Sequence, residues 1–275
     1  IQTLRIPTLV AFALEPAIRK PPNRYEFHLF GGLTAQVQAL LTYAAGQIDP
    51  PPQRPAVIYL DESPWSGIAE RIAKHSRSLG WEDVVTVALP SRVQSFDPLP
   101  TVDELRDKKI DLLVLLAPEH SAHLVRAAAT RSWAPTVLVP GILSTDILES
   151  SAPQTGPPIY VSLPSVPTDR GERARNALSE LQERAGISHR FLAAQVNALA
   201  TAVLLIEGLK RSGRALSREK LVDVMAGIYD FNTGLTPPVS YGPNRRIGAR
   251  GSYVYTLNRS TGQLVAASGW IDSDP

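Results

Sequence analysis

The sequence predicts an α/β fold with a Rossmann-like parallel sheet, and three observations predict it. Short runs rich in Val, Ile or Leu lie at 56–60, 111–116 and 136–139, and such runs suit strands that are buried on both faces. Helical patterns separate these runs. Strands that alternate with helices in this way favour a parallel, doubly wound sheet.

The stretch from 55 to 163 contains enough elements for one complete Rossmann-like lobe. Its first helix ends before Gly80, because glycine commonly terminates helices. Besides the three strands above, the expected elements are a helix at 66–79, a strand at 84–89, a helix at 119–132 and a strand at 159–163. We therefore interpret 55–163 as a second lobe, preceded by a remnant of a first lobe.

That remnant and crossover occupy 1–54, and the segment 164–275 completes the two lobes. Strand patterns lie at 8–11 and 25–30 and a helix at 34–45 in the first part; the last part has helices at 171–185, 191–211 and 217–226 and a hairpin formed by 253–257 and 263–271. The first part alone offers too few strands for a sheet. We therefore expect an incomplete first lobe and a C-terminal hairpin.

The longest apolar stretch, 191–209, approaches the length that crosses a membrane. Gln195, Asn197 and Glu207 interrupt it, and polar groups of this kind are costly in a lipid bilayer. We interpret this stretch as a buried helix of a protein that does not span a membrane.

Composition and motifs exclude several classes of function. The 28 Lys and Arg residues nearly balance 26 Asp and Glu and are scattered, which argues against nucleic acid as a partner. The absence of cysteine excludes disulfides and thiolate chemistry. His120 and His123 lack a third metal ligand and are interpreted as helix-surface histidines. No nucleotide-binding or hydrolase motif is present, so no enzyme, cofactor or metal is expected.

Four segments carry a resemblance to a known family. They are IPTLVAFALEP at 6–16, YEFHLF at 25–30 followed by Gln36, AVIYLDESPWSG at 56–67, and the set formed by 216–223, 231–235 and 240–248. In this order they resemble segments of the type I periplasmic binding proteins, specifically the leucine/isoleucine/valine-binding receptors of branched-chain amino acid ABC transporters. The resemblance covers nearly the whole chain.

The resemblance implies a type I periplasmic binding fold, in which two lobes close on a small solute that is handed to an ABC transporter permease. It implies a periplasmic location, with any signal peptide outside this segment. Receptors of this family have several βα units before the strand that resembles 6–11, so this chain is expected to lack the N-terminal part of the first lobe.

Ligands of open α/β sheets collect beyond the carboxyl ends of the strands. After the strand at 56–60, Trp65 takes the position of a ligand-stacking tyrosine of the family and is expected to line the cleft between the lobes; its alternative is an aromatic packed on its own lobe. Ser63 and Ser66 are candidate donors to a carboxylate, or else caps of the next helix.

The other candidate contacts are mostly apolar. Pro118 and Glu119 follow the strand at 111–116, although Glu119 is also what the first turn of a helix favours. Gly141 and Ile142 stand where the family holds the ammonium group of an amino acid.

On the first-lobe side, the resemblance aligns Phe12 and Leu14 with residues that carry hydroxyls in the family. The amino-acid clamp is thus expected to be absent and the site to be more apolar than usual. We predict a solute receptor for a small organic ligand other than a standard amino acid. The alternative is a ligand-free, sensory or interaction domain of a larger exported protein.

Overall fold

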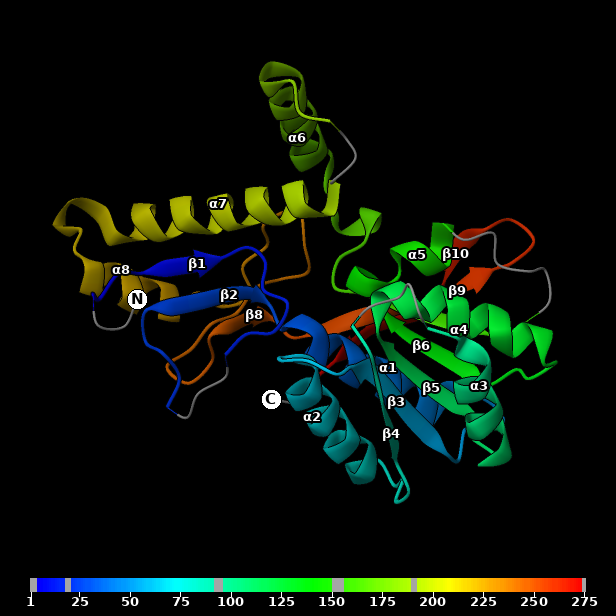
Figure 1. The fold of residues 1–275 in the computed structure, drawn as a ribbon. Helices are drawn as coiled ribbons and strands as arrows, with labels where there is room; N and C mark the ends of the chain where they lie inside the picture. The colour runs from blue at the N-terminus through cyan, green and yellow to red at the C-terminus, as the bar shows by residue number, and fades with distance from the viewer. Residues whose placement is uncertain (1–3, 18–20, 92–95, 150–155, 189–191, 274–275) are drawn as a thin grey trace. The chain divides into compact units, whose positions relative to one another are not determined.

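The computed structural model describes residues 4–17, 21–91, 96–149, 156–188 and 192–273. The chain forms two compact units (Figure 1). Unit 1 comprises residues 1–32 and 164–250, and unit 2 comprises residues 33–163 and 251–275. The chain therefore starts in unit 1, crosses to unit 2, returns, and ends in unit 2.

Unit 2 is built on a seven-stranded sheet in the order β10-β9-β7-β6-β5-β3-β4. The strands β3 to β7 pair in parallel, and β9 and β10 continue the sheet as an antiparallel hairpin. Their bounds are β3 Pro55–Leu60, β4 Val85–Leu89, β5 Leu112–Leu116, β6 Thr136–Pro140, β7 Ile159–Leu163, β9 Gly251–Asn258 and β10 Gln263–Asp272. These parallel pairs confirm the predicted parallel sheet. Its strand β5 is buried at every residue, as strands covered on both faces are.

The helices of unit 2 are α1 Gly32–Gln47, α2 Trp65–Ser78, α3 Pro98–Asp107, α4 Pro118–Thr130 and α5 Thr145–Glu149, with the short 3-10 helix η2 at Gly141–Leu143. Helix α1 precedes β3, and α2 to α5 connect the parallel strands. Helix α3 was not predicted, because Pro98 and Pro100 are residues typical of a loop. Both prolines lie in the first turn, where a missing N–H costs nothing, and Asp97 caps the helix by accepting a hydrogen bond from the amide of Leu99 at 3.0 Å.

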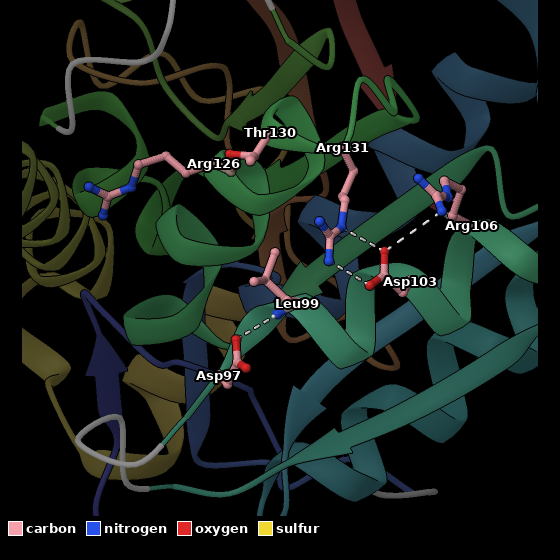
Figure 2. Close-up of polar contacts among 7 residues, drawn as sticks. All are labelled: Asp97, Leu99, Asp103, Arg106, Arg126, Thr130 and Arg131. Carbon is pink, nitrogen blue, oxygen red and sulfur yellow. Dashed lines mark hydrogen bonds and ion pairs between the residues drawn. The ribbon is translucent and has the colours of Figure 1, made fainter.

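The arginine that directly follows α4 ties this helix to α3 (Figure 2). Arg131 donates from Nε and Nη2 to the two carboxylate oxygens of Asp103, at 2.8 and 2.9 Å. Arg106 lies on the other side of the same carboxylate, 3.9 Å away. The two guanidinium groups lower the pKa of Asp103, and the hydrogen bond from Arg131 is the main cause.

Unit 1 contains a three-stranded parallel sheet in the order β1-β2-β8. Its elements are β1 Thr8–Val10, β2 Glu26–Phe30, the 3-10 helix η3 Pro167–Asp169, α6 Glu172–Ala185, α7 Leu192–Ser212, the 3-10 helix η5 Gly213–Ala215, α8 Arg218–Ala226 and β8 Ile247–Ala249. The third strand was not predicted, since its Ile-Gly-Ala sequence has no strand signal. Gly248 is needed there because a Cβ would collide with Val239.

Helix α7 is not the buried helix that the sequence analysis expected. Val196, Ala200 and Leu204 are fully buried in the core of unit 1, together with Phe27 and Leu29 of β2. The opposite face is open, and α7 with η5 is long and apolar enough to cross a membrane by length and composition alone, with 28% of its most apolar window buried. The core helix of a soluble protein meets the same criterion.

Candidate functional site

The carboxyl ends of four parallel strands meet at one edge of the unit 2 sheet. The register pairs Tyr59 with Leu116, Val114 with Leu138, and Pro140 with Ser162. The loops that follow β3, β5 and β6 therefore emerge side by side. The structure brings the candidate residues of unit 2 to the same edge, namely Ser63, Trp65, Ser66, Pro118, Glu119, Gly141 and Ile142.

The first loop leaves β3 in a tight turn. The amide of Asp61 donates to the carbonyl of Leu89 at 2.8 Å, and the amide of Trp65 donates to the carbonyl of Glu62 at 2.9 Å. Trp65 is the first residue of α2 and is only 8% exposed, so protein covers most of its indole ring. This burial favours the alternative in which Trp65 mainly packs on protein.

Ser63 and Ser66 flank the start of α2 and are both exposed. No side chain caps α2, because Pro64 occupies the cap position. The capping alternative for these two serines therefore finds no support. Their hydroxyls face solvent at the amino end of a helix, where the amide dipoles favour negatively charged groups.

The second loop opens helix α4. Pro118 is half-buried, and Glu119 is exposed in the first turn, where a carboxylate complements the helix dipole. His123 is exposed as expected, but His120 is not a surface histidine. Its ring is fully buried and lies 4.5 Å from the ring of Phe96.

The burial of His120 follows from its neighbours on α4. Leu124 and Val125 pack into the core on the same side, and the helix carries His120 inward with them. Desolvation is the main cause that lowers the pKa of His120, and it outweighs the opposing effects of Glu119 and the Pro90 backbone. The neutral form is therefore favoured.

The third loop begins at Gly141, which packs against the backbone of β7. A Cβ at Gly141 would collide with the carbonyl oxygen of Ser162 and approach Leu163, so only glycine fits without a shift. Ser144 Oγ donates to the Gly141 carbonyl at 2.8 Å and holds this turn. Ile142 is half-buried beside it.

Ser162 is a polar group at this edge that the sequence analysis missed. It lies near the carboxyl end of β7, is fully buried, and its hydroxyl has no hydrogen-bond partner among the described residues. Because it alternates with apolar residues in a strand, its sequence looks like ordinary strand sequence. Only the pairing of Pro140 with Ser162 places it next to the Gly141 loop.

The candidate residues of unit 1 follow strand β1. Phe12 is 57% exposed and Leu14 is half-buried. The loop packs on Gly32, whose φ of +69° and close contacts with Leu14 and Pro16 both require glycine. Phe12 is thus an exposed aromatic on an anchored loop.

In the described part of the chain, no group of three or more His, Asp or Glu residues could hold a metal ion. The edge of unit 2 offers hydroxyls, apolar surface, and the exposed carboxylates of Asp61, Glu62 and Glu119. This inventory suits the noncovalent binding of an organic molecule.

Comparison with solved structures identifies relatives of this fold. A branched-chain amino acid ABC transporter protein from Thermus thermophilus with bound valine matches with a TM-score of 0.78 at 18% identity, over 99% of this chain and 74% of that one. An ABC transporter solute-binding protein from R. palustris in complex with 4-hydroxybenzoate matches with a TM-score of 0.74 at 16% identity, over 100% and 74% of the chains.

A fatty acid ABC transporter substrate-binding protein from Thermomonospora curvata matches with a TM-score of 0.73 at 16% identity, over 100% of this chain and 71% of that one. No curated protein matches the sequence. The family model described as "Periplasmic binding protein" matches residues 1–263. Together with the mostly parallel α/β fold, this match shows that the chain belongs to the periplasmic binding protein family, as a type I member resembling the ABC transporter solute receptors.

Proposed function

We propose that this solute receptor binds a small organic molecule other than a standard amino acid, at the carboxyl edge of the unit 2 sheet. The observation that carries the proposal is the chemistry of the third loop. Gly141 and Ile142 provide no charge for an ammonium group, and the close packing of Gly141 on Ser162 leaves no room for a charged side chain there. An amino acid would leave its ammonium group without a partner at this loop.

The residues at this edge suit a ligand with an anionic group and an apolar body. Ser63 and Ser66 are exposed and free of any capping role, at a helix start that favours an anion. Pro118 and Ile142 contribute apolar surface, with Trp65 behind the first loop. Phe12 and Leu14 are the candidate apolar contacts of unit 1.

The ligands named for the similar structures include molecules other than amino acids, which supports the proposal. One similar protein holds valine, another is in complex with 4-hydroxybenzoate, and a third is described as a fatty acid receptor. The fold therefore does not select amino acids by itself, and the loop residues decide the ligand.

The family implies a periplasmic or other extracytoplasmic location and a small-molecule ligand. We further propose that the partner is an ABC transporter permease, with neither nucleic acid nor a membrane span involved. In this role the receptor contributes binding and no bond-making chemistry, in keeping with the absence of any catalytic motif in the sequence.

The burial of Trp65 favours one alternative, a binding-protein fold without a transported ligand. If the indole at 8% exposure serves only packing, the edge loses its expected aromatic contact. The chain would then act as a sensory or interaction domain of a larger exported protein.

The test is a thermal-shift screen of the protein against organic acids and amino acids, followed by affinity measurements on Ser63→Ala and Ser66→Ala. Both serines are exposed and cap nothing, so these changes leave stability unchanged and weaken binding of a carboxylate ligand severalfold. A ligand that both variants bind as tightly as the wild type would place the site elsewhere. A screen without any stabilising compound would favour the domain without a ligand.

The contribution of Trp65 needs a matched control, because removing a buried tryptophan destabilises the fold wherever it lies. Trp81 is similarly buried at 6% and follows α2, at the opposite end of that helix. Trp65→Phe and Trp81→Phe should both lower the melting temperature. Weaker ligand binding by the Trp65 variant alone would assign the indole to the site.

A further inference from the structure

Helices α3 and α4 pack side by side in unit 2, and His120 joins their beginnings. His120 lies in the first turn of α4, and its exposed fraction is 0%. Its ring centroid is 4.5 Å from that of Phe96, at an interplanar angle of 58°. Phe96 directly precedes Asp97, which caps the start of α3. The ring contact therefore holds the start of α4 on the approach to α3.

A second contact joins the same two helices farther along. Arg131, directly after α4, donates two hydrogen bonds to the carboxylate of Asp103 on α3 (Figure 2). The side chains of this ion pair are 37% and 36% exposed. The helix pair is thus joined by a buried ring near the start of both helices and by a partly exposed ion pair at the end of α4.

The surroundings of His120 favour a neutral ring. Burial disfavours a charged imidazole and is the main cause that lowers its pKa. The positive end of the helix dipole at the start of α4 acts in the same direction.

The charged and titratable neighbours of this ring lie on its own helix. Among the residues that the structure describes, Glu119 favours the protonated ring and His123 opposes it. From the connection between β4 and α3, the ring meets Phe96 and the backbone of Pro90, and neither carries a charge. A proton on His120 would therefore be held in mostly apolar surroundings, where a charge is costly.

We propose that His120 is a proton-sensitive clamp: its neutral ring holds the start of α4 against the approach to α3, and protonation in mild acid opens this contact. Histidine is suited to this role because its charge changes between about pH 5 and 8. Once protonated, the imidazole gains more from water than from the ring of Phe96, so the open arrangement becomes more populated.

Opening of the clamp would disturb the candidate edge of unit 2. Pro118 and Glu119 directly precede His120 in the first turn of α4, so they move with it. Mild acid should therefore weaken ligand binding at this edge. This consequence rests on the proposed function, whereas the clamp itself can be tested without any ligand.

The test is amide hydrogen exchange of the whole protein at pH 7.5 and 5.5, with rates corrected for the chemical exchange rate at each pH. Peptides from the starts of α3 and α4 should exchange faster in acid. The increase is up to about tenfold per pH unit below about 6.5, because the open state binds one more proton. Peptides from α1, which contains no histidine, should keep the same corrected rate.

Two substitutions remove the proton and leave the rest of the contact. His120→Phe keeps an aromatic ring beside Phe96, and His120→Gln keeps a neutral polar side chain if phenylalanine does not fit. In both variants the corrected exchange rates of α3 and α4 should be the same at the two pH values. The matched control is His123→Gln, because His123 is exposed on the same helix and this variant should respond to acid as the wild type does.

The same response to acid in the wild type and in both His120 variants would overturn the proposal. So would a wild type whose exchange at the start of α4 does not change with pH, or whose exchange rises equally in α1, which indicates a general effect of acid. Because exchange is measured without a ligand, a failure of the proposed receptor function would leave this result unaffected.

Discussion

Gly141 lies against the carbonyl oxygen of Ser162 with no space for a Cβ atom, so the third candidate loop is fixed to strand β7 by the absence of a side chain. Gly141→Ala should therefore lower the free energy of unfolding by about 1–3 kcal/mol, as overpacked sites do. The measurement is denaturant unfolding followed by circular dichroism.

Gly46→Ala is the control for this substitution. Gly46 lies in α1 with open space around it, and alanine there should be neutral or stabilise the protein by roughly 0.5 kcal/mol. If Gly141→Ala were as well tolerated as Gly46→Ala, the close packing of the loop on Ser162 would be wrong.

Adjacent leucines on α7 should respond very differently to truncation. Leu204 is fully buried and Leu205 is 37% exposed. Leu204→Ala should lower the free energy of unfolding by about 2–5 kcal/mol, because it leaves a cavity in the core of unit 1. Leu205→Ala should cost under about 1 kcal/mol. Similar losses of stability in the two variants would show that both faces of α7 are packed.

The ion pair between Asp103 and Arg131 should stabilise the protein in a pH-dependent way. The pKa of Asp103 is lower in the folded state, so the unfolded chain binds more protons as the pH falls. The stabilisation is present above the ordinary aspartate pKa of about 3.9 and is lost as the pH falls through the lower folded value. Melting curves of the wild type and Asp103→Asn should therefore converge in acid.

Asp107→Asn on the same helix is the control, because Asp107 is exposed and forms no ion pair with a described residue. Its melting temperature should follow that of the wild type across the same pH range. If the melting temperatures of Asp103→Asn and the wild type differed by the same amount at all pH values, the charge of Asp103 would not be the cause of the stabilisation.

Elements with a strong local signal were predictable. Strand β5 consists of Leu and Val alone, and such a run predicts a strand buried on both faces. The structure confirms its position and its parallel pairing with β3. Strand β8 was missed because Ile247–Ala249 is short and contains glycine. Its place in the sheet depends on β2, which is distant in sequence, and no local pattern records that pairing.

Side-chain burial was less predictable than secondary structure. His120 and His123 are three residues apart in the same helix, yet one is fully buried beside Phe96 and the other is exposed. Helix α7 carries apolar residues on all its faces, so its sequence could not indicate which stripe packs in the core. The loops of the candidate site were located because the strands before them were recognisable, whereas Ser162 lies within a strand and emerged only from the register of β6 and β7.

Calorimetric titration of the protein with leucine, valine and glutamate tests the central claim most directly. The claim is that the third loop, with Gly141 and Ile142, provides no charged partner for the ammonium group of an amino acid. We expect no measurable heat of binding from any of the three amino acids, and a saturable titration with an organic acid identified by thermal shift. Tight, saturable binding of leucine, valine or glutamate would contradict the account.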